Sequence, residues 1–300
     1  MSIRLGIDLG GTKIEIVALD PAGRDLLRMR TDTPRGDYLA TLNTIATLVQ
    51  QADDFLGTRA ATVGIGIPGI ESPATGLIKN ANSTWLIGRP LRPDLERTLA
   101  RPVRLANDAN CFAMSEAADG AGAGASIVFG VILGTGVGGG IVVDGRPVTG
   151  INAIAGEWGH NPLPWPEDDE RPGPACYCGR SGCIEQFLSG PGLAADFVRE
   201  SGGNMTAREI AEAAAAGEKV TGQALTRYEH RLGRALASII NVLDPDVIVL
   251  GGGLSNIDRL YENVPALWSR WVFSDTVATQ LRKNIHGDSS GVRGAAWLWP

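Results

Sequence analysis

Short apolar runs rich in β-branched residues alternate along the first half of this 300-residue chain with segments of helical periodicity. Runs of this kind, bounded by turn residues, predict strands. The strands predicted in this half cover residues 3–9, 14–20, 62–67 and 103–106. Apolar residues recur at helical spacing over 37–56, and a second helix is predicted from Asp108 to about Gly120. The first two strands are separated by a glycine turn, which predicts a hairpin.

The second half repeats this order. A strand is predicted over 127–133, a glycine-rich loop follows, and a hairpin partner is predicted over 141–143. A long helix is predicted over 221–243, ending before a proline, and a buried strand over 247–250. Each half thus starts with a strand, a glycine turn and a second strand. We therefore expect an α/β protein with two related domains flanking a cleft, divided near residue 120.

Composition and charge exclude several classes of function. Hydrophobic residues make up 44% of the chain and charged residues 20%, which is typical of globular proteins. The net charge of −6 argues against nucleic acid as a partner, because phosphate binding needs a basic surface. No apolar run approaches the ~20 residues that span a bilayer, and the first residues lack the pattern of a signal peptide. We therefore expect a cytoplasmic protein with no membrane partner, in which thiols stay reduced.

Three glycine-rich turns follow strands and are candidates for nucleotide binding. They are Asp8-Leu-Gly-Gly-Thr-Lys13, Gly134-Thr-Gly-Val-Gly-Gly-Gly140 and Gly251-Gly-Gly253. Glycine lets the backbone approach a phosphate closely, and successive amides can form an anion-binding nest. A single turn is as well explained by a plain hairpin in a chain with 40 glycines. Two turns at equivalent positions, with a third after a strand, favour a nucleotide cleft.

The first two turns differ from the P-loop and Rossmann patterns, in which the glycines lead into a helix. Hydroxyl donors and one positive charge accompany the glycines, and Asp8 can hold Mg²⁺ directly or through water. The residues assigned to the nucleotide and its Mg²⁺ are Gly6, Ile7, Asp8, Leu9, Gly10, Gly11, Thr12, Lys13, Gly134, Thr135, Gly136, Val137, Gly138, Gly139, Gly140, Ile141, Gly251, Gly252 and Gly253.

Asp108 stands where a predicted strand becomes a predicted helix. The local sequence favours an N-cap, because aspartate is a preferred residue at that position. A carboxylate at this junction is also able to accept a proton from a substrate hydroxyl, as phosphoryl transfer requires. Spacing alone leaves both roles open.

Three of the four cysteines lie within eight residues, and a histidine precedes them. The four candidate ligands are His160, Cys176, Cys178 and Cys183. This Cys₃His set suits tetrahedral zinc, and because protein fills all four positions the zinc is expected to be structural. Buried free thiols are the alternative, disfavoured by the close spacing, whereas Cys111 is expected to be a plain core thiol. Glu157 and Glu185 bracket the set and are candidates for binding a polar substrate.

Together these residues resemble the ROK family of sugar kinases, within the actin-like ATPase superfamily. The motifs that carry the resemblance are Asp8-Leu-Gly-Gly-Thr-Lys13, Asn107-Asp108, Gly134-Thr-Gly-Val-Gly-Gly-Gly140, Gly156-Glu-Trp-Gly-His160 and Cys176-x-Cys-Gly-x-x-Gly-Cys183-x-Glu185. The resemblance implies two actin-like (ribonuclease H-like) domains. The first would cover residues 1–120, joined by the C-terminal helix 288–300, and the second residues 121–287, with the zinc-binding loop.

The resemblance also implies ATP-dependent phosphorylation of a hexose, with ATP, Mg²⁺ and Zn²⁺ as cofactors and a homodimer as the assembly. Asp108 would be the general base that takes the proton from the 6-hydroxyl of the sugar, in place of the local preference for a cap. The residues that would contact the sugar are Asn107, Asp108, Glu157, His160 and Glu185. His160 would bind zinc through its other ring nitrogen.

Two segments bear on the choice of hexose. Asn80-Ala-Asn-Ser-Thr-Trp85 and His160-Asn-Pro-Leu-Pro-Trp165 resemble bacterial fructokinases that also act on mannose. D-Fructose is therefore the first expectation, with mannose, glucose and N-acetylglucosamine as alternatives that differ only in contacts to ring substituents. Fifteen residues separate His160 from Cys176, more than is typical of glucokinases of the family. The segment 161–175 is interpreted either as a border of the sugar site or as a surface excursion.

Two further classes of function are less favoured. A sugar-responsive repressor of this family carries a helix-turn-helix before the kinase-like core, whereas the phosphate loop here begins at Asp8. A non-catalytic sugar-binding protein would not need Asp8, Lys13 and Asp108 together.

Overall fold

The computed structural model describes residues 3–60 and 62–299, and the chain divides into two compact units. The first unit comprises Met1–Gly124, Gly140–Ala155 and Asp288–Pro300, and the second comprises Ala125–Gly139 and Gly156–Gly287. The sequence analysis assigned residues 140–155 to the second domain. They belong to the first unit because Gly140 lies directly against the helix that follows Asn107, where an added Cβ would come within 2.6 Å of the Ala109 carbonyl oxygen.

The first unit is built on a five-stranded sheet with the order β3-β2-β1-β4-β7. Its strands are β1 Arg4–Leu9, β2 Lys13–Leu19, β3 Asp25–Asp32, β4 Val63–Ile67 and β7 Val103–Asn107. β1 and β2 pair antiparallel, whereas β4 pairs parallel with both β1 and β7, so the predicted hairpin and the two later strands are confirmed. The sequence analysis does not predict β3. This edge strand alternates charged and apolar residues and contributes no fully buried position.

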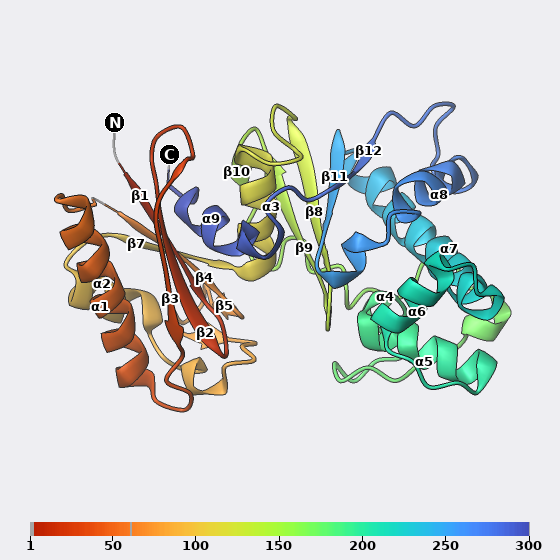
Figure 1. Ribbon diagram of the computed structural model, residues 1–300, viewed down its shortest axis with the longest axis horizontal. Helices are drawn as coiled ribbons and strands as arrows, with labels where there is room; N and C mark the ends of the chain where they lie inside the picture. The colour runs from red at the N-terminus through yellow and green to blue at the C-terminus, as the bar shows by residue number, and fades with distance from the viewer. Residues whose placement is uncertain (1–2, 61, 300) are drawn as a thin grey trace. The chain divides into compact units, whose positions relative to one another are not determined.

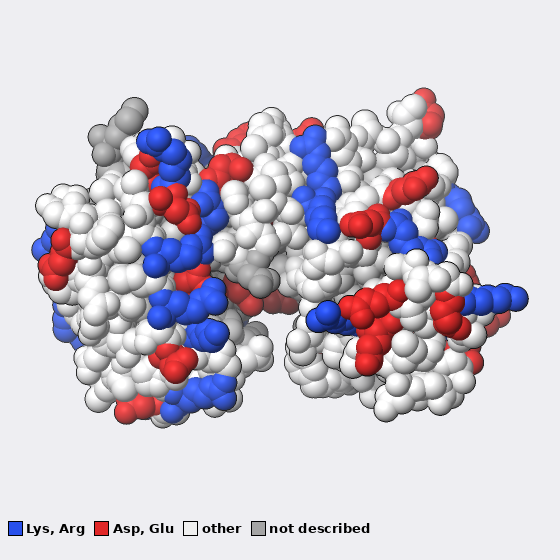
Figure 2. Space-filling view, in the orientation of Figure 1, with Lys and Arg blue, Asp and Glu red and all other residues white. Residues whose placement is uncertain are grey.

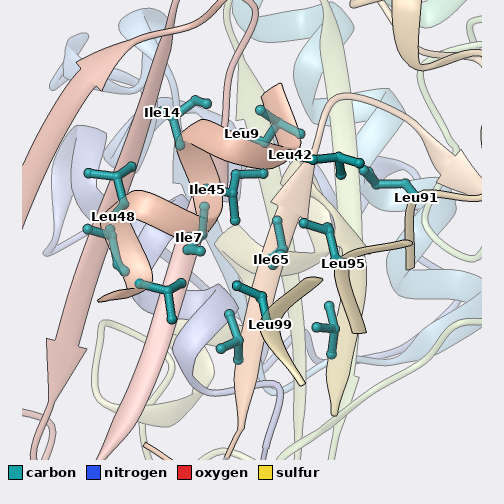
Figure 3. Close-up of a cluster of buried hydrophobic side chains, with 14 of the residues drawn as sticks. Ile7, Leu9, Ile14, Leu42, Ile45, Leu48, Ile65, Leu91, Leu95 and Leu99 are labelled. Carbon is teal, nitrogen blue, oxygen red and sulfur yellow. The ribbon is translucent and has the colours of Figure 1, made fainter. Parts of the chain in front are cut away.

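Side chains of β1 alternate between the two faces of this sheet, as a strand period of two requires. Leu5, Ile7 and Leu9 join the main core, where α1 Tyr38–Leu56 and α2 Leu91–Leu99 cover one face (Figure 3). Gly6 and Asp8 face the other side, which is covered by α9 Ser290–Ala296 with α3 Asp108–Ala118 packed beside it (Figure 1). The alternation therefore places the Asp8 carboxylate away from the main core.

The remaining elements of the first unit are short. A two-stranded sheet pairs β5 Ile70–Glu71 with β6 Ile78–Lys79, and η1 Thr84–Leu86 and η5 Gly287–Ser289 are single 3₁₀ turns. Figure 2 shows Lys and Arg side chains gathered over β2 and β3, with acidic side chains between them. Arg28 pairs with Asp25 and Glu15, and Arg30 also pairs with Glu15. These ion pairs balance the positive charge of the two arginines.

Helix α9 packs on β1, β4 and α3 at distances that exclude any side chain at three glycines. An added Cβ on Gly6 would lie 2.2 Å from the Val292 carbonyl oxygen, and one on Gly64 would lie 1.8 Å from that of Ala295. On α9 itself, an added Cβ on Gly294 would lie 1.6 Å from the Cys111 carbonyl oxygen. Part of the glycine content therefore serves close backbone packing.

We expect Gly294→Ala to lower the free energy of unfolding by about 1–3 kcal/mol or more, because overpacking forces the backbone of α9 away from α3. Gly222→Ala is the matched control, since Gly222 lies in a helix with open space at its Cβ position. That change should be neutral or stabilise by up to about 1 kcal/mol through helix propensity. Urea denaturation followed by circular dichroism measures both variants. Equal stability of the two would contradict the packing described for α9.

The second sheet has the order β10-β9-β8-β11-β12. Its strands are β8 Ile127–Leu133, β9 Val137–Val143, β10 Arg146–Pro147, β11 Val247–Gly251 and β12 Gln280–Lys283. The helices of the second unit are α4 Ile184–Leu188, α5 Gly190–Ser201, α6 Ala207–Ala215, α7 Lys219–Leu243 and α8 Leu260–Leu267, with turns η2 Asp168–Glu170, η3 Gly253–Asn256 and η4 Trp268–Arg270. The helix predicted to end before Pro245 is confirmed in α7. The buried strand predicted after Pro245 is confirmed in β11. The sequence analysis does not predict β12 or α4, α5, α6 and α8.

Strand β9 corrects the prediction of a glycine loop up to residue 140. The strand begins at Val137 and includes Gly138, Gly139 and Gly140. An added Cβ on Gly139 would lie 2.8 Å from both the Gly156 carbonyl oxygen and the Trp158 ring. Gly139 and Gly140 thus lie in a strand against which neighbouring segments pack too closely for a side chain, and only Gly134–Gly136 forms the turn. Within residues 3–60 and 62–299, no helix is long and apolar enough to cross a membrane.

Candidate active site and metal centre

The first glycine turn is a tight hairpin whose tip faces solvent. The Gly10 amide donates to the Lys13 carbonyl oxygen at 3.0 Å, and the Thr33 hydroxyl donates to the Gly10 carbonyl oxygen at 2.8 Å. Gly11, Thr12 and Lys13 are exposed. Of the other residues assigned to the nucleotide, Ile7 and Leu9 are core side chains and Gly6 packs on α9. The polar groups that this segment can offer a ligand are therefore Asp8 and the hairpin tip.

Asp8 lies in a confined, acidic environment on the α9 side of the sheet. Its carboxylate sits beneath Gly291 and near Gly66, where added Cβ atoms would both lie 3.7 Å from carboxylate atoms. Burial, followed by repulsion from Asp108 and Glu15, raises the pKa of Asp8 to about 6. A carboxylate surrounded by other carboxylates is a suitable ligand for a divalent cation, because the cation relieves their repulsion.

Asp108 is the first residue of α3 and not its cap. The cap is Asn107, whose side-chain oxygen accepts from the Ala109 amide at 2.9 Å. The Asp108 carboxylate accepts from the same amide at 2.8 Å and is exposed to solvent. The local preference for a cap at Asp108 is therefore wrong by one residue. The N-terminus of a helix also favours the ionised form of a carboxylate in its first turn.

Burial next to these carboxylates suppresses ionisation of Cys111. This thiol is fully buried, and burial together with the charges of Asp8 and Asp108 raises its pKa well above the usual value. Cys111 is thus a neutral core thiol, as the sequence analysis expects.

The glycine turn of the second unit is held from both sides. The Gly134 amide donates to the Gly136 carbonyl oxygen at 3.0 Å, and the Gly190 amide at the start of α5 donates to the Gly134 carbonyl oxygen at 2.8 Å. Gly252 approaches the same turn with φ +79°, and an added Cβ there would lie 2.4 Å from the Leu133 carbonyl oxygen. A left-handed conformation and a close contact both require glycine at this position.

A cavity of about 880 Å³ opens beside this turn. It contains Gly134 and Thr135 from the turn and Gly253 from the start of η3, so two of the three predicted glycine segments meet here. Its wall is formed mainly by α5, α6, α7, η3 and the residues after η3, at Gly190, Pro191, Ala207, Arg208, Ala211, Glu212, Ala215, Leu225, Leu254, Asn256, Ile257, Asp258 and Arg259. The sequence analysis misses these wall residues. Their small and apolar positions on α6 carry only the ordinary signal of an amphipathic helix.

The four predicted metal ligands meet in the second unit. One ligand atom from each of His160, Cys176, Cys178 and Cys183 lies within 4.8 Å of the others. The Cys176 sulfur lies 3.6 Å from His160 Nδ1, and the sulfurs of Cys178 and Cys183 lie 3.6 Å apart. Sulfur ligands at ~2.3 Å from a tetrahedral zinc lie about 3.8 Å apart. The donor set therefore fits a single zinc ion with little rearrangement.

His160 presents its second nitrogen to a tyrosine. Nε2 lies 2.9 Å from the Tyr177 hydroxyl, and the two rings meet edge to face. Tyr177 is 82% exposed, so its hydroxyl can exchange partners with solvent or a ligand. The sequence analysis misses Tyr177, although its place between two cysteines is a usable signal.

The two glutamates that bracket the metal ligands have different environments. Glu185 is buried in the first turn of α4, and its carboxylate accepts from the Val137 amide at 2.9 Å. Glu185 thereby connects the segment that carries the candidate metal ligands with the glycine turn. Gly136 of that turn has no room for a Cβ beside the Glu185 carboxylate. Glu157 is exposed. Next to it, buried Trp158 donates its indole N–H to the Gly138 carbonyl oxygen at 3.1 Å.

The family model described as the ROK family matches residues 4–300. The chain belongs to the ROK family. It is 42% identical over 297 residues to an N-acetyl-D-glucosamine kinase of Photobacterium profundum, with 98% of each chain covered. It is 31% identical to the ROK hexokinase of Thermus thermophilus, with a TM-score of 0.87 over 99% of this chain and 97% of that one. A ROK family glucokinase of Streptomyces griseus, solved with glucose and AMPPNP, is 29% identical, with a TM-score of 0.74 over 98% of each chain.

These neighbours confirm the predicted family and the predicted actin-like class of fold. They do not support the prediction of fructokinase specificity, because the curated relative is named for N-acetylglucosamine.

The raised pKa of Asp8 predicts a cost in stability at neutral pH. An ordinary carboxyl ionises near pH 3.8, whereas folded Asp8 ionises near 6. Between these values the folded chain binds more protons than the unfolded one, so this group lowers stability as pH rises from about 4 to about 6. We expect Asp8→Asn to raise the free energy of unfolding of the metal-free ROK protein at pH 7.5 by about 1–3 kcal/mol.

Urea denaturation of both proteins at pH 7.5 and at pH 4 measures this effect. The difference between variant and wild type should largely disappear at pH 4, where Asp8 is protonated in the folded chain. A variant that is less stable than the wild type at pH 7.5 would contradict the prediction.

Proposed function

We propose that this ROK-family sugar kinase transfers the γ-phosphoryl group of ATP to the 6-hydroxyl of N-acetyl-D-glucosamine. The observation that carries the proposal is 42% identity, over 98% of both chains, to a relative named for that activity. The choice replaces D-fructose, which the sequence analysis placed first, with one of its alternatives. The segments used to favour fructose lie in loops, which vary among relatives more than the elements they connect.

The proposed general base is Asp108. Its carboxylate is exposed at the first turn of α3, so a sugar hydroxyl can reach it. Its place in the first turn of a helix, where the partial positive charge of the N-terminus favours a carboxylate, suits a proton acceptor. Asn107 supports this assignment because it supplies the cap, a role that Asp108 therefore does not need to fill. Transfer of the hydroxyl proton to Asp108 would accompany attack of the oxygen on the γ-phosphorus.

The proposed nucleotide site uses the cavity of about 880 Å³ beside the second glycine turn. Its small and apolar wall residues suit an adenosine, and Thr135 and Gly253 offer backbone amides to phosphates. The hairpin tip of the first unit, with Lys13, is the second phosphate-binding segment proposed. Asp8 would hold the Mg²⁺ that accompanies ATP, where its charge stabilises the phosphates during transfer.

The proposed role of zinc is structural. Four protein ligands complete a tetrahedron, so no coordination site remains for substrate. The ion would fix the His160 ring through Nδ1, and Nε2 would then be available to a sugar hydroxyl in exchange for Tyr177. Glu157 and Glu185 are proposed to bind further sugar hydroxyls.

The proposed base predicts the behaviour of Asp108→Asn. We expect kcat to fall by about 10²–10⁴-fold, because the amide cannot accept the proton. The dissociation constant for N-acetylglucosamine, measured by isothermal titration calorimetry, should change by no more than a few-fold. Asp37→Asn is the matched control, since Asp37 is an exposed N-cap of α1 and asparagine caps equally well. Turnover of Asp108→Asn within a few-fold of wild type would exclude Asp108 as the base.

The proposed substrate is tested by an ADP-release assay with MgATP and four sugars. We expect kcat/KM for N-acetylglucosamine to exceed that for glucose, mannose and fructose by at least about tenfold, since contacts to the acetamido group are worth about 1–3 kcal/mol. A maximum with fructose would restore the first expectation. Absence of turnover with all four sugars would overturn the proposal of a hexose kinase.

A further inference from the structure

The segment between His160 and Cys176 is tethered to the long helix α7 through a buried cluster of charges. Glu170, at the end of η2, accepts from Arg231 at 2.7 Å and from Arg234 at 2.7 and 2.8 Å. All three side chains are at most 4% exposed. Arg231 also donates to Asp196 of α5 at 2.7 Å. The segment therefore runs largely over the surface but is anchored by a buried ion-pair cluster at Glu170.

Glu170 is the buried charged residue of this segment. Of residues 161–175, all of which the structure describes, Leu163 and Glu170 are the buried ones. Arg234 also donates to the Trp165 carbonyl oxygen at 2.6 Å, and the Trp165 ring stacks on Trp271 at 5.3 Å. Trp165 has φ +45°, a strained conformation for a bulky residue that persists only where its surroundings enforce it. If the ion pairs of Glu170 are lost, few buried apolar contacts remain to hold this segment.

The same cluster reaches the helix that follows the last cysteine. The Arg231 guanidinium lies 5.2 Å from the centre of the Phe187 ring in α4. The Tyr228 hydroxyl of α7 donates to the Leu188 carbonyl oxygen at 2.9 Å. Helix α4 carries Glu185 and begins directly after Cys183. Helix α7 thus contacts the chain on both sides of the three cysteines.

This arrangement affects the free energy of metal binding. A metal that must first order a flexible 15-residue segment spends part of its binding energy on loop closure. A segment already closed by ion pairs spares that cost, so the metal binds more tightly. Glu170 lies between His160 and Cys176, so its ion pairs fix the middle of the segment that joins these two candidate ligands.

We infer that Glu170, through Arg231 and Arg234, is a positioning residue that preorganises the metal centre and, with it, the sugar-binding side of the second unit. The effect on sugar binding rests on the proposed function, whereas the effect on zinc does not. Removal of the Glu170 charge should speed zinc release and raise the KM for the sugar. The KM for MgATP should stay within about twofold, because the cluster does not line the cavity beside the glycine turn.

The test compares Glu170→Gln with Asp53→Asn. Asp53 forms a buried ion pair with Arg101 in the first unit, so the same chemical change there costs stability without touching the metal loop. Zinc release from each purified protein is followed with a chromogenic chelator, and Cys178→Ala marks the loss of a ligand. We expect Glu170→Gln to release zinc about 10- to 100-fold faster than Asp53→Asn, as is usual when support of metal ligands is lost.

Equal release rates for folded Glu170→Gln and Asp53→Asn would overturn the inference, whether or not the wild type phosphorylates a sugar. Inactivity of the wild type toward all sugars would overturn only the proposed function.

A second measurement needs no variant. The Leu163 amide donates to the Gly182 carbonyl oxygen at 2.9 Å, and the Gly182 amide donates to the Pro174 carbonyl oxygen at 2.9 Å. After zinc is removed from the wild type, both amides should keep their protection from hydrogen exchange. Loss of that protection on zinc removal would show that the metal, and not Glu170, orders the segment.

Discussion

The packing of the first unit depends on the close approach of α9 to β1, β4 and α3. Gly6, Gly64 and Gly294 allow backbone atoms to meet where any larger residue would collide. The same helix places Gly291 against the Asp8 carboxylate. Since Gly294 also contacts Cys111 of α3, the position of the helix that begins at Asp108 depends on this packing. The two acidic residues proposed for catalysis are thus held by backbone contacts between elements far apart in sequence.

Charge is handled differently in the two units. In the first unit, burial and then the charges of Asp108 and Glu15 raise the pKa of Asp8, which costs stability and favours a cation. In the second unit, burial opposes ionisation of Glu170, but hydrogen bonds from Arg234, Arg231 and the Glu167 amide outweigh it and lower the pKa of that carboxyl. Carboxylates that repel one another thus lie around Asp8, where we propose chemistry. The Glu170 carboxylate is neutralised by arginines, where the chain needs a fixed geometry.

Much of the candidate site could be predicted from sequence because its signals are local. The cysteine spacing and the preceding histidine predict the ligand group that the structure brings together. The hairpin at Gly10 follows from two apolar runs separated by glycines. By contrast, the cap at Asn107 differs from the expected Asp108 by one residue, since both side chains favour that position and only the backbone path selects between them.

The sequence by itself determined the family, the two-part α/β organisation and the group of candidate metal ligands, because each depends on residue types at fixed spacing along the chain. Tertiary structure alone decided that Gly138, Gly139 and Gly140 belong to a strand, that residues 140–155 join the first unit, and that Glu170 ties the metal loop to α7. These features depend on atoms that are distant in sequence and close in space. A glycine needed for close packing and a glycine needed for a turn look the same until the neighbouring backbone is in place.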